Sequence, residues 1–107
     1  EVEATLKPGE RHIYAKRTFF IDEDTWQAAV IDHYDGRDTL WRVAEAHAEY
    51  IYNDQVPLYA METLYDLVSG RYLVMGMKNE EKNPYVYNYK ANSNQYTPAA
   101  LRNSGVR

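Results

Sequence analysis

Residues 58–77, LYAMETLYDLVSGRYLVMGM, decide the fold because their pattern predicts a complete β-hairpin. Between residues 58 and 68 the alternating pattern has the period of two that is typical of a strand, with one face made of Tyr59, Met61, Thr63, Tyr65 and Leu67. Ser69-Gly70 then predicts a two-residue turn into a second strand over residues 71–77. The stretch therefore predicts two antiparallel strands side by side.

The same rhythm runs through the sequence that precedes this hairpin. Aromatic, β-branched and alternating apolar residues predict earlier strands over 1–6, 11–21 and 26–34. Turn-forming residues separate them, at 7–10, 22–25 and 35–38. Short connections between successive strands indicate an antiparallel meander of six or seven strands.

Residues 39–52 fit two structures. The alanines favour a helix, with Leu40, Val43, Ala44, His47 and Ile51 on one face. As a strand, the stretch has one face made of Ala44, Ala46, Ala48, Tyr50 and Tyr52. We favour a long strand because β-rich segments lie on both sides, and its alanine face would then be a place where another layer packs closely.

The last part of the chain is different. Residues 78–96 are polar and predict an extended loop, and the alternation of Tyr85, Tyr87 and Tyr89 leaves a short strand open. Residues 97–104 predict a short helix, with Thr97 as cap, Pro98 in the first turn and Gly105 as the stop. The expected fold is mainly β, an antiparallel meander over 1–77 with a short C-terminal helix.

Composition excludes several functional classes. The 107 residues carry a net charge of −4 without a basic run, which argues against nucleic-acid binding. There is no cysteine, so disulfides and thiolate metal sites are excluded. No apolar run approaches the ~20 residues that a membrane-spanning helix needs. The alternation that begins at residue 1 suggests a strand already under way, as in a fragment of a larger domain.

No pattern indicates an enzyme, a metal site or a cofactor. His12, His33 and His47 lack ligand spacing; His47 with Glu45 and Glu49 comes closest, and a solvated polar face explains that group better. Asp22, Glu23 and Asp24 read as turn residues, because Asp there bonds its own backbone. The serines lack the surroundings of a nucleophile. Scattered basic residues could hold an anionic headgroup, although a solvated surface is favoured: Arg11, Lys16, Arg17, Arg37 and Arg42.

Four strings of the sequence resemble a known family. Residues 11–26, RHIYAKRTFFIDEDTW, are similar to a segment of a Gram-negative bacterial family of unknown function whose members are labelled outer-membrane lipoprotein-sorting proteins. The strings at 40–43, 65–72 and 96–102 fit the same family in the same order. The resemblance covers nearly all of residues 1–107 and matches the C-terminal end of the family, so it implies a single fragment of a larger domain.

The resemblance implies a fold and a function. The family is similar to the periplasmic carriers LolA and LolB, whose curved antiparallel half-barrel shelters lipid acyl chains. It implies a non-enzymatic binder of lipid or another hydrophobic molecule, in the periplasm or at the outer membrane, working beside a membrane exporter. The alternative is a structural sheet that docks on the parent protein or on a transporter. A partial sheet would also expose a strand edge through which chains could self-associate.

The carrier hypothesis predicts aromatic and apolar residues on the inward face of the sheet. The residues expected to bind the ligand are Tyr14, Phe20, Trp26, Tyr59, Met61 and Tyr65. A period of two separates the two faces but does not say which is concave. The identity of the ligand does not follow from the sequence.

Overall fold

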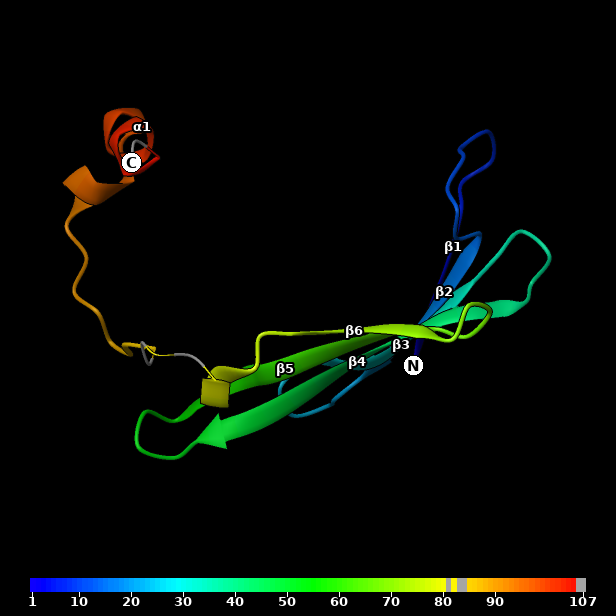
Figure 1. The fold of residues 1–107 in the computed structure, drawn as a ribbon, viewed down its shortest axis with the longest axis horizontal. Helices are drawn as coiled ribbons and strands as arrows, with labels where there is room; N and C mark the ends of the chain where they lie inside the picture. Colours follow the sequence, from blue (N-terminus) through cyan, green and yellow to red (C-terminus); the bar gives the residue numbers. More distant parts are fainter. Residues whose placement is uncertain (81, 83–84, 106–107) are drawn as a thin grey trace.

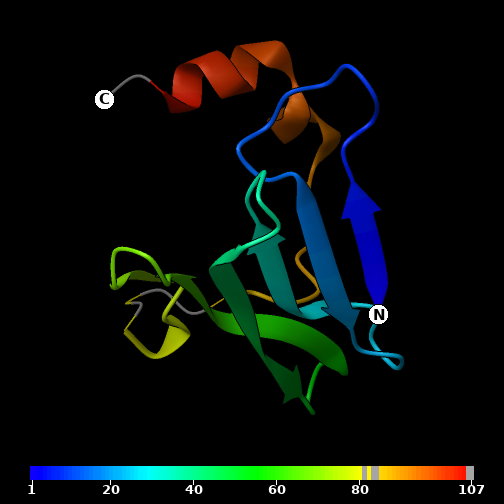
Figure 2. The same cartoon turned by 90° about the vertical axis from the view of Figure 1, so that its right-hand side faces the viewer.

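A computed structural model describes residues 1–80, 82 and 85–105 of the chain. It contains one antiparallel sheet whose six strands lie in chain order, which confirms the predicted meander (Figures 1 and 2). The strands are β1 (Val2–Thr5), β2 (Lys16–Ile21), β3 (Ala28–Tyr34), β4 (Leu40–Ile51), β5 (Val56–Asp66) and β6 (Arg71–Met75).

The ambiguous stretch forms a strand, as favoured from the sequence. β4 pairs with β5 from Arg42 opposite Asp66 to Ile51 opposite Val56, the longest pairing in the sheet. Its alanines have helical propensity, but β4 pairs with β5 from Arg42 to Ile51 and also with β3 as far as Glu45, which satisfies much of its backbone. Tertiary pairing therefore outweighs local preference here.

Two predicted strands begin later than the sequence suggested. The strand expected from residue 11 starts at Lys16, because the segment before it turns: the backbone N–H of Tyr14 donates to Nδ1 of His12 at 3.0 Å. The strand expected from Trp26 starts at Ala28, since Trp26 has φ = 59° and closes the preceding turn by donating its N–H to the Asp22 carbonyl at 3.0 Å. Neither conformation continues a ladder.

The β5–β6 connection is longer than expected. Asp66 pairs with Arg71, so residues 67–70 form a four-residue loop where a two-residue turn was predicted. The Asp66 side chain explains the difference, because its Oδ1 accepts hydrogen bonds from the backbone N–H groups of Val68 and Ser69, at 3.2 and 2.9 Å. Gly70 ends the loop at φ = 69°.

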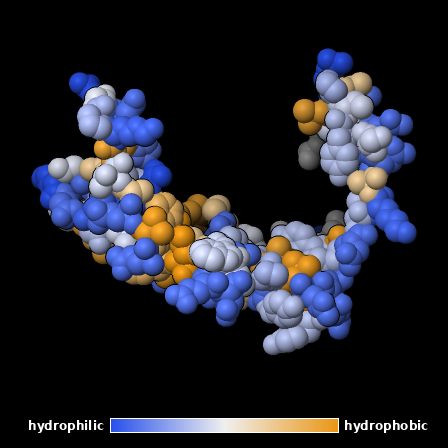
Figure 3. Space-filling view, turned by 180° about the vertical axis from the view of Figure 1, so that it is seen from behind, coloured by the Kyte–Doolittle hydropathy of each residue, from blue (hydrophilic) through white to orange (hydrophobic). Residues whose placement is uncertain are grey.

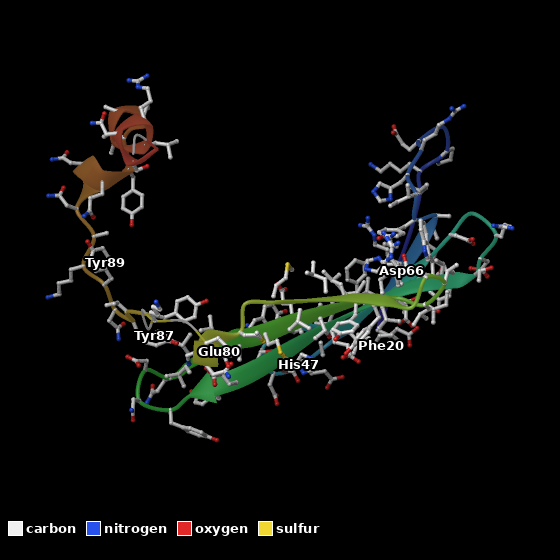
Figure 4. All side chains as sticks on the ribbon, in the orientation of Figure 1. Phe20, His47, Asp66, Glu80, Tyr87 and Tyr89 are labelled. Carbon is white, nitrogen blue, oxygen red and sulfur yellow. The ribbon has the colours of Figure 1, made fainter. Side chains whose placement is uncertain are left out.

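Cross-strand partners define the two faces of the sheet, because residues directly opposite each other point to the same side. We call one the Asp66 face and the other the Phe20 face, after residues that lie on opposite sides of the ribbon in Figure 4. The ends of the molecule rise toward the side on which Asp66 lies, so the Asp66 face is the concave one (Figures 1 and 4).

A β-bulge within β5 changes which face of the sheet the residues before it point to. His47 pairs with Met61 but Ala48 pairs with Tyr59, which leaves Ala60 as the extra residue. The expected single face of Tyr59, Met61, Thr63 and Tyr65 is therefore split. Met61, Thr63 and Tyr65 lie on the Phe20 face, while Tyr59 lies on the Asp66 face.

The described residues contain no buried hydrophobic side chain, and only Thr18 and Thr63 are buried. Figure 3 shows apolar side chains exposed over the sheet between hydrophilic ends. A twisted sheet normally needs a second layer to cover its apolar face. The fold is therefore an open single layer whose apolar face is available to something else.

The C-terminal segment leaves the sheet and forms the predicted helix. The short 3₁₀ turns η1 (Lys78–Glu80) and η2 (Ser93–Tyr96) precede α1 (Pro98–Ser104). Thr97 caps α1 by accepting the Ala100 N–H at 3.1 Å. In the described part of residues 78–97 no strand forms, and α1 contacts η2 rather than the sheet. Neither α1 nor any other helix among the described residues is long and apolar enough to cross a membrane.

We expect Gly70→Ala to destabilise the full-length protein by about 1 kcal/mol, the cost of holding an L-residue in the left-handed region. No atom lies within 4 Å of the position that the new Cβ would take, so the cost comes from the backbone alone. Gly36→Ala is the matched control, since Gly36 has equal space and no positive φ. Urea unfolding should separate the two variants, and equal midpoints would contradict the assignment.

Candidate functional site

An apolar groove runs over the middle of the Asp66 face. In register, every strand contributes one apolar residue to a continuous row: Val2, Phe19, Ile31, Ala44, Leu64 and Leu73. The groove has a volume of about 380 Å³, and its lining includes Ile31, Ala44, Ala46, Leu64 and Met75. Such a row can remove a long apolar chain from water along its whole length.

The groove is shaped by residue size. Ala44 and Ala46 of β4 lie on its floor, where small side chains leave room above the sheet. Tyr59 stands at the side, and its hydroxyl donates to the Ala28 carbonyl at 3.1 Å. This hydrogen bond fixes the ring across β3, β4 and β5, which the bulge at Ala60 makes possible. The predicted alanine face therefore forms the floor of the groove.

One end of the groove meets a group of charged and aromatic residues that we call the arginine cluster: Tyr14, Arg17, His33, Arg42 and Asp66. Arg17, His33, Arg42 and Asp66 are successive cross-strand partners, so they form the row next to the apolar one. The Tyr14 ring covers them, with centroids 4.4 Å from His33 and 5.3 Å from the Arg17 guanidinium carbon. His33 also lines the groove.

Asp66 holds the cluster together. Its Oδ2 accepts from Nε of Arg42 at 2.9 Å and from Nε1 of Trp41 at 3.2 Å. Arg42 in turn donates to the Tyr14 hydroxyl at 2.8 Å. The backbone N–H of Ser69 and the Arg42 guanidinium lower the pKa of the Asp66 carboxyl to about 2, so it stays charged in this setting.

His33 sits beside cations. Burial, followed by the positive charges of Arg17 and Arg42, lowers the pKa of its imidazole from 6.5. The ring is therefore neutral at neutral pH and retains one N–H that can donate. A neutral imidazole beside two guanidinium groups can donate one hydrogen bond to an anion.

The six predicted ligand-binding residues do not share a face. Tyr14 and Tyr59 lie on the Asp66 face. Phe20, Met61 and Tyr65 lie on the other face, since Met61 and Tyr65 pair with His47 and Val43. Trp26 lies in a turn and is 80% exposed. The turn before β2, the bulge in β5 and the turn at Trp26 cause this division. Ligand binding by these residues stays a prediction.

The residues weighed as enzyme candidates have structural partners. Asp22 accepts the backbone N–H and the hydroxyl of Thr25, at 2.9 and 2.6 Å, as expected of a turn. His47 lies 3.6 Å from Glu45, while Glu49 forms an ion pair with Lys78. Among residues 1–80, 82 and 85–105 no group of three His, Cys, Asp or Glu side chains is placed to hold a metal ion. His47 and Glu45 lie on a partly solvated surface, with side-chain exposures of 46% and 37%.

The sequence pointed to single parts of the site but not to how they meet. The arginines appeared scattered because Arg17 and Arg42 are far apart in the chain, and only the register of β2, β3 and β4 brings them beside His33. The alternation of Ala44, Ala46 and Ala48 was the available signal for the groove floor.

We expect Asp66→Asn to flatten the dependence of stability on pH below about 4. The folded pKa of about 2 lies below the ordinary 3.8, so the contribution of Asp66 is present above about pH 4 and is lost as pH falls toward 2. Urea midpoints of the full-length protein across this range measure it. Asp24→Asn controls for the loss of one exposed negative charge. Equal slopes for wild type and Asp66→Asn would contradict the role of this carboxylate.

A solved structure has the same fold. The chain superposes with a TM-score of 0.52 on the crystal structure of a "putative outer membrane lipoprotein-sorting protein domain" from Vibrio parahaemolyticus. The two are 13% identical over 64% of this chain and 28% of that one. At this identity the likeness concerns the fold alone, and it agrees with the open antiparallel sheet described above.

Sequence comparison gives the family. The chain is 76% identical over 106 residues to the "Uncharacterized protein PA3922" of Pseudomonas aeruginosa, covering 99% of this chain and 23% of that protein. It thus spans about a quarter of the length of this relative. Residues 1–102 match the family described as "Protein of unknown function (DUF1329)". The expected relationship to a Gram-negative family of unknown function is confirmed, and the chain belongs to the DUF1329 family.

Proposed function

We propose that this chain forms part of the ligand-holding sheet of a non-enzymatic carrier for a lipid or another hydrophobic molecule. One observation carries the proposal: an apolar residue from each of six strands forms an uninterrupted row on the concave face. This row borders a groove of about 380 Å³ and lacks a covering layer among the described residues.

We expect ligand binding to be driven by the burial of apolar surface area. Each methylene group of a bound chain that leaves water contributes about 0.8 kcal/mol, so affinity grows with chain length. Ala44, Ala46 and Leu64 on the floor end in methyl groups and offer no side-chain hydrogen bond. The polar part of the lining comes from His33, Glu45, Glu62 and Thr63. A carrier built this way binds along the chain with little directional preference, which suits a protein that must also release its cargo.

The relatives support a location for this carrier. The structure with the same fold is described as an outer membrane lipoprotein-sorting domain, and the similar chain comes from the Gram-negative bacterium Pseudomonas aeruginosa. We propose that this carrier works in the periplasm or at the outer membrane, beside a membrane exporter that delivers or receives the ligand.

Docking within the same protein is the second candidate. Ala44, Ala46 and Ala48 share one face of β4, and small residues allow another layer to approach closely. The relative from Pseudomonas aeruginosa is more than four times as long as the matched region, so the occupant would be a helix or sheet layer from the rest of the protein. In that case the apolar row is interior packing rather than a binding surface.

Mass spectrometry of organic extracts tests the proposal. The full-length protein that carries this sequence is purified gently from a Gram-negative host, and we expect a stoichiometric apolar molecule that is absent from a control protein. Ala44→Phe should lower the bound amount several-fold because its ring fills the groove. Val43→Phe is the matched control, since the neighbouring residue points to the opposite face.

The outcomes separate the two candidates. Loss of the ligand in folded Ala44→Phe, with retention in Val43→Phe, supports the carrier. An empty wild-type protein that also fails to bind a fluorescent fatty-acid probe would overturn it. Unfolding of Ala44→Phe together with an empty wild type favours docking, because a large ring on an interior floor overpacks the core.

A further inference from the structure

Two buried nitrogen atoms in the arginine cluster have no protein partner. Among the described residues, Nε of Arg17 and Nδ1 of His33 are inaccessible to solvent and accept or donate no hydrogen bond. Arg17 and His33 are direct cross-strand partners on β2 and β3, so both atoms lie on the Asp66 face. A buried polar atom without a partner is costly, so both atoms would gain from a shift of the Tyr14 ring that lets a ligand pair with them.

The charge of the same row is unbalanced. Three guanidinium groups, those of Arg17, Arg42 and Arg71, share it with one carboxylate, that of Asp66. Asp66 is already occupied, because it accepts from Arg42, from Trp41 and from two backbone N–H groups. In the described part of the chain no carboxylate lies within 4 Å of Arg17. Arg17 and Arg71 are therefore the guanidinium groups of this row without a carboxylate partner among the described residues, and Arg17 is the one opposite His33 beside the groove.

Tyr14 accounts for only part of this arrangement. The guanidinium of Arg17 lies 5.3 Å from the centre of the Tyr14 ring, a cation–π contact that positions the charge without bonding its N–H groups. The Tyr14 hydroxyl accepts from Arg42 and keeps its own proton to donate. Tyr14, Arg17 and His33 each have an N–H or O–H group available to donate, and the Tyr14 ring lies against both neighbours.

The cluster is joined to the apolar groove. On β2 and β3 the charged row lies two residues from the apolar row on the same face, about 7 Å along each strand. His33 belongs to both, since it pairs with Arg17 and lines the groove. A molecule with an apolar chain in the groove would place its end group against these donors.

We propose that the ligand of this groove is an anionic amphiphile whose phosphate or carboxylate group is bound by Arg17 and His33, with Tyr14 as a third donor. The inference rests on the carrier function proposed above and names its ligand class. Arg42 positions the site, because its ion pair with Asp66 and its hydrogen bond to Tyr14 hold the ring in place. A planar guanidinium suits an oxyanion because it can donate two parallel hydrogen bonds.

Calorimetric titration of the full-length protein tests the proposal with three probes below their micelle concentrations. Dodecyl phosphate carries the anion and the chain, dodecyl glucoside carries the chain alone, and inorganic phosphate carries the anion alone. We expect dodecyl phosphate to bind about tenfold more tightly than dodecyl glucoside, as charge-assisted hydrogen bonds predict. Inorganic phosphate should bind far more weakly than either, since it leaves the groove empty.

Variants of Arg17 test whether this residue causes the preference for the anionic probe. Arg17→Gln should remove the preference for dodecyl phosphate and leave the affinity for dodecyl glucoside unchanged. Arg17→Lys keeps the charge and should restore part of the preference. Arg37→Gln is the matched control, because it removes the same charge from a side chain that is 90% exposed in the β3–β4 turn.

Each result has a distinct meaning. Equal binding of the two dodecyl compounds by wild type overturns the anionic headgroup and leaves the carrier standing, and this comparison needs no variant to fold. A preference that survives Arg17→Gln overturns the assigned residues. Binding of inorganic phosphate as tight as that of dodecyl phosphate would make the site one for a free anion. Failure of both dodecyl compounds to bind wild type contradicts the carrier itself.

Discussion

The apolar face of the sheet has to be covered, and the rest of the structure depends on that constraint. Six strands place an apolar residue in one row, yet no hydrophobic side chain among the described residues is buried. Backbone pairing alone supplies too little stability for a single open layer in water. A bound apolar chain or a further layer of structure on the Asp66 face would complete the core that the sheet begins.

The bulge at Ala60 decides what that face offers. Without the extra residue, Tyr59 would point away from the groove together with Met61 and Tyr65. With it, the Tyr59 ring reaches across to Ala28 and forms one side of the groove. The inserted residue therefore moves Tyr59 to the groove side and leaves Met61 and Tyr65 on the opposite face. That opposite face also carries Glu45, His47 and Thr63.

The end of the groove is organised by a loop. Asp66 fixes the turn that follows β5 through two backbone hydrogen bonds, and the same carboxylate holds Arg42 and Trp41. Arg42 then orients Tyr14 over Arg17 and His33. Because Asp66 neutralises Arg42, the positive charge of Arg17 is left for something outside the described residues. The turn, the ion pair and the proposed anion site are thus parts of one arrangement.

The sequence by itself determined the element types: alternation and turn residues predicted the antiparallel meander, and Thr97 and Pro98 predicted α1. These signals are local, since they depend on backbone preferences of neighbouring residues. Only the tertiary structure decided which side chains meet. The side of the sheet on which each β5 residue lies depends on a bulge that no residue type predicts. The approach of Arg17, His33 and Arg42 depends on the register of three strands. A period of two in the sequence predicts neither an inserted residue nor which face of the sheet is concave. The groove and its charged end could therefore be located only in the folded sheet.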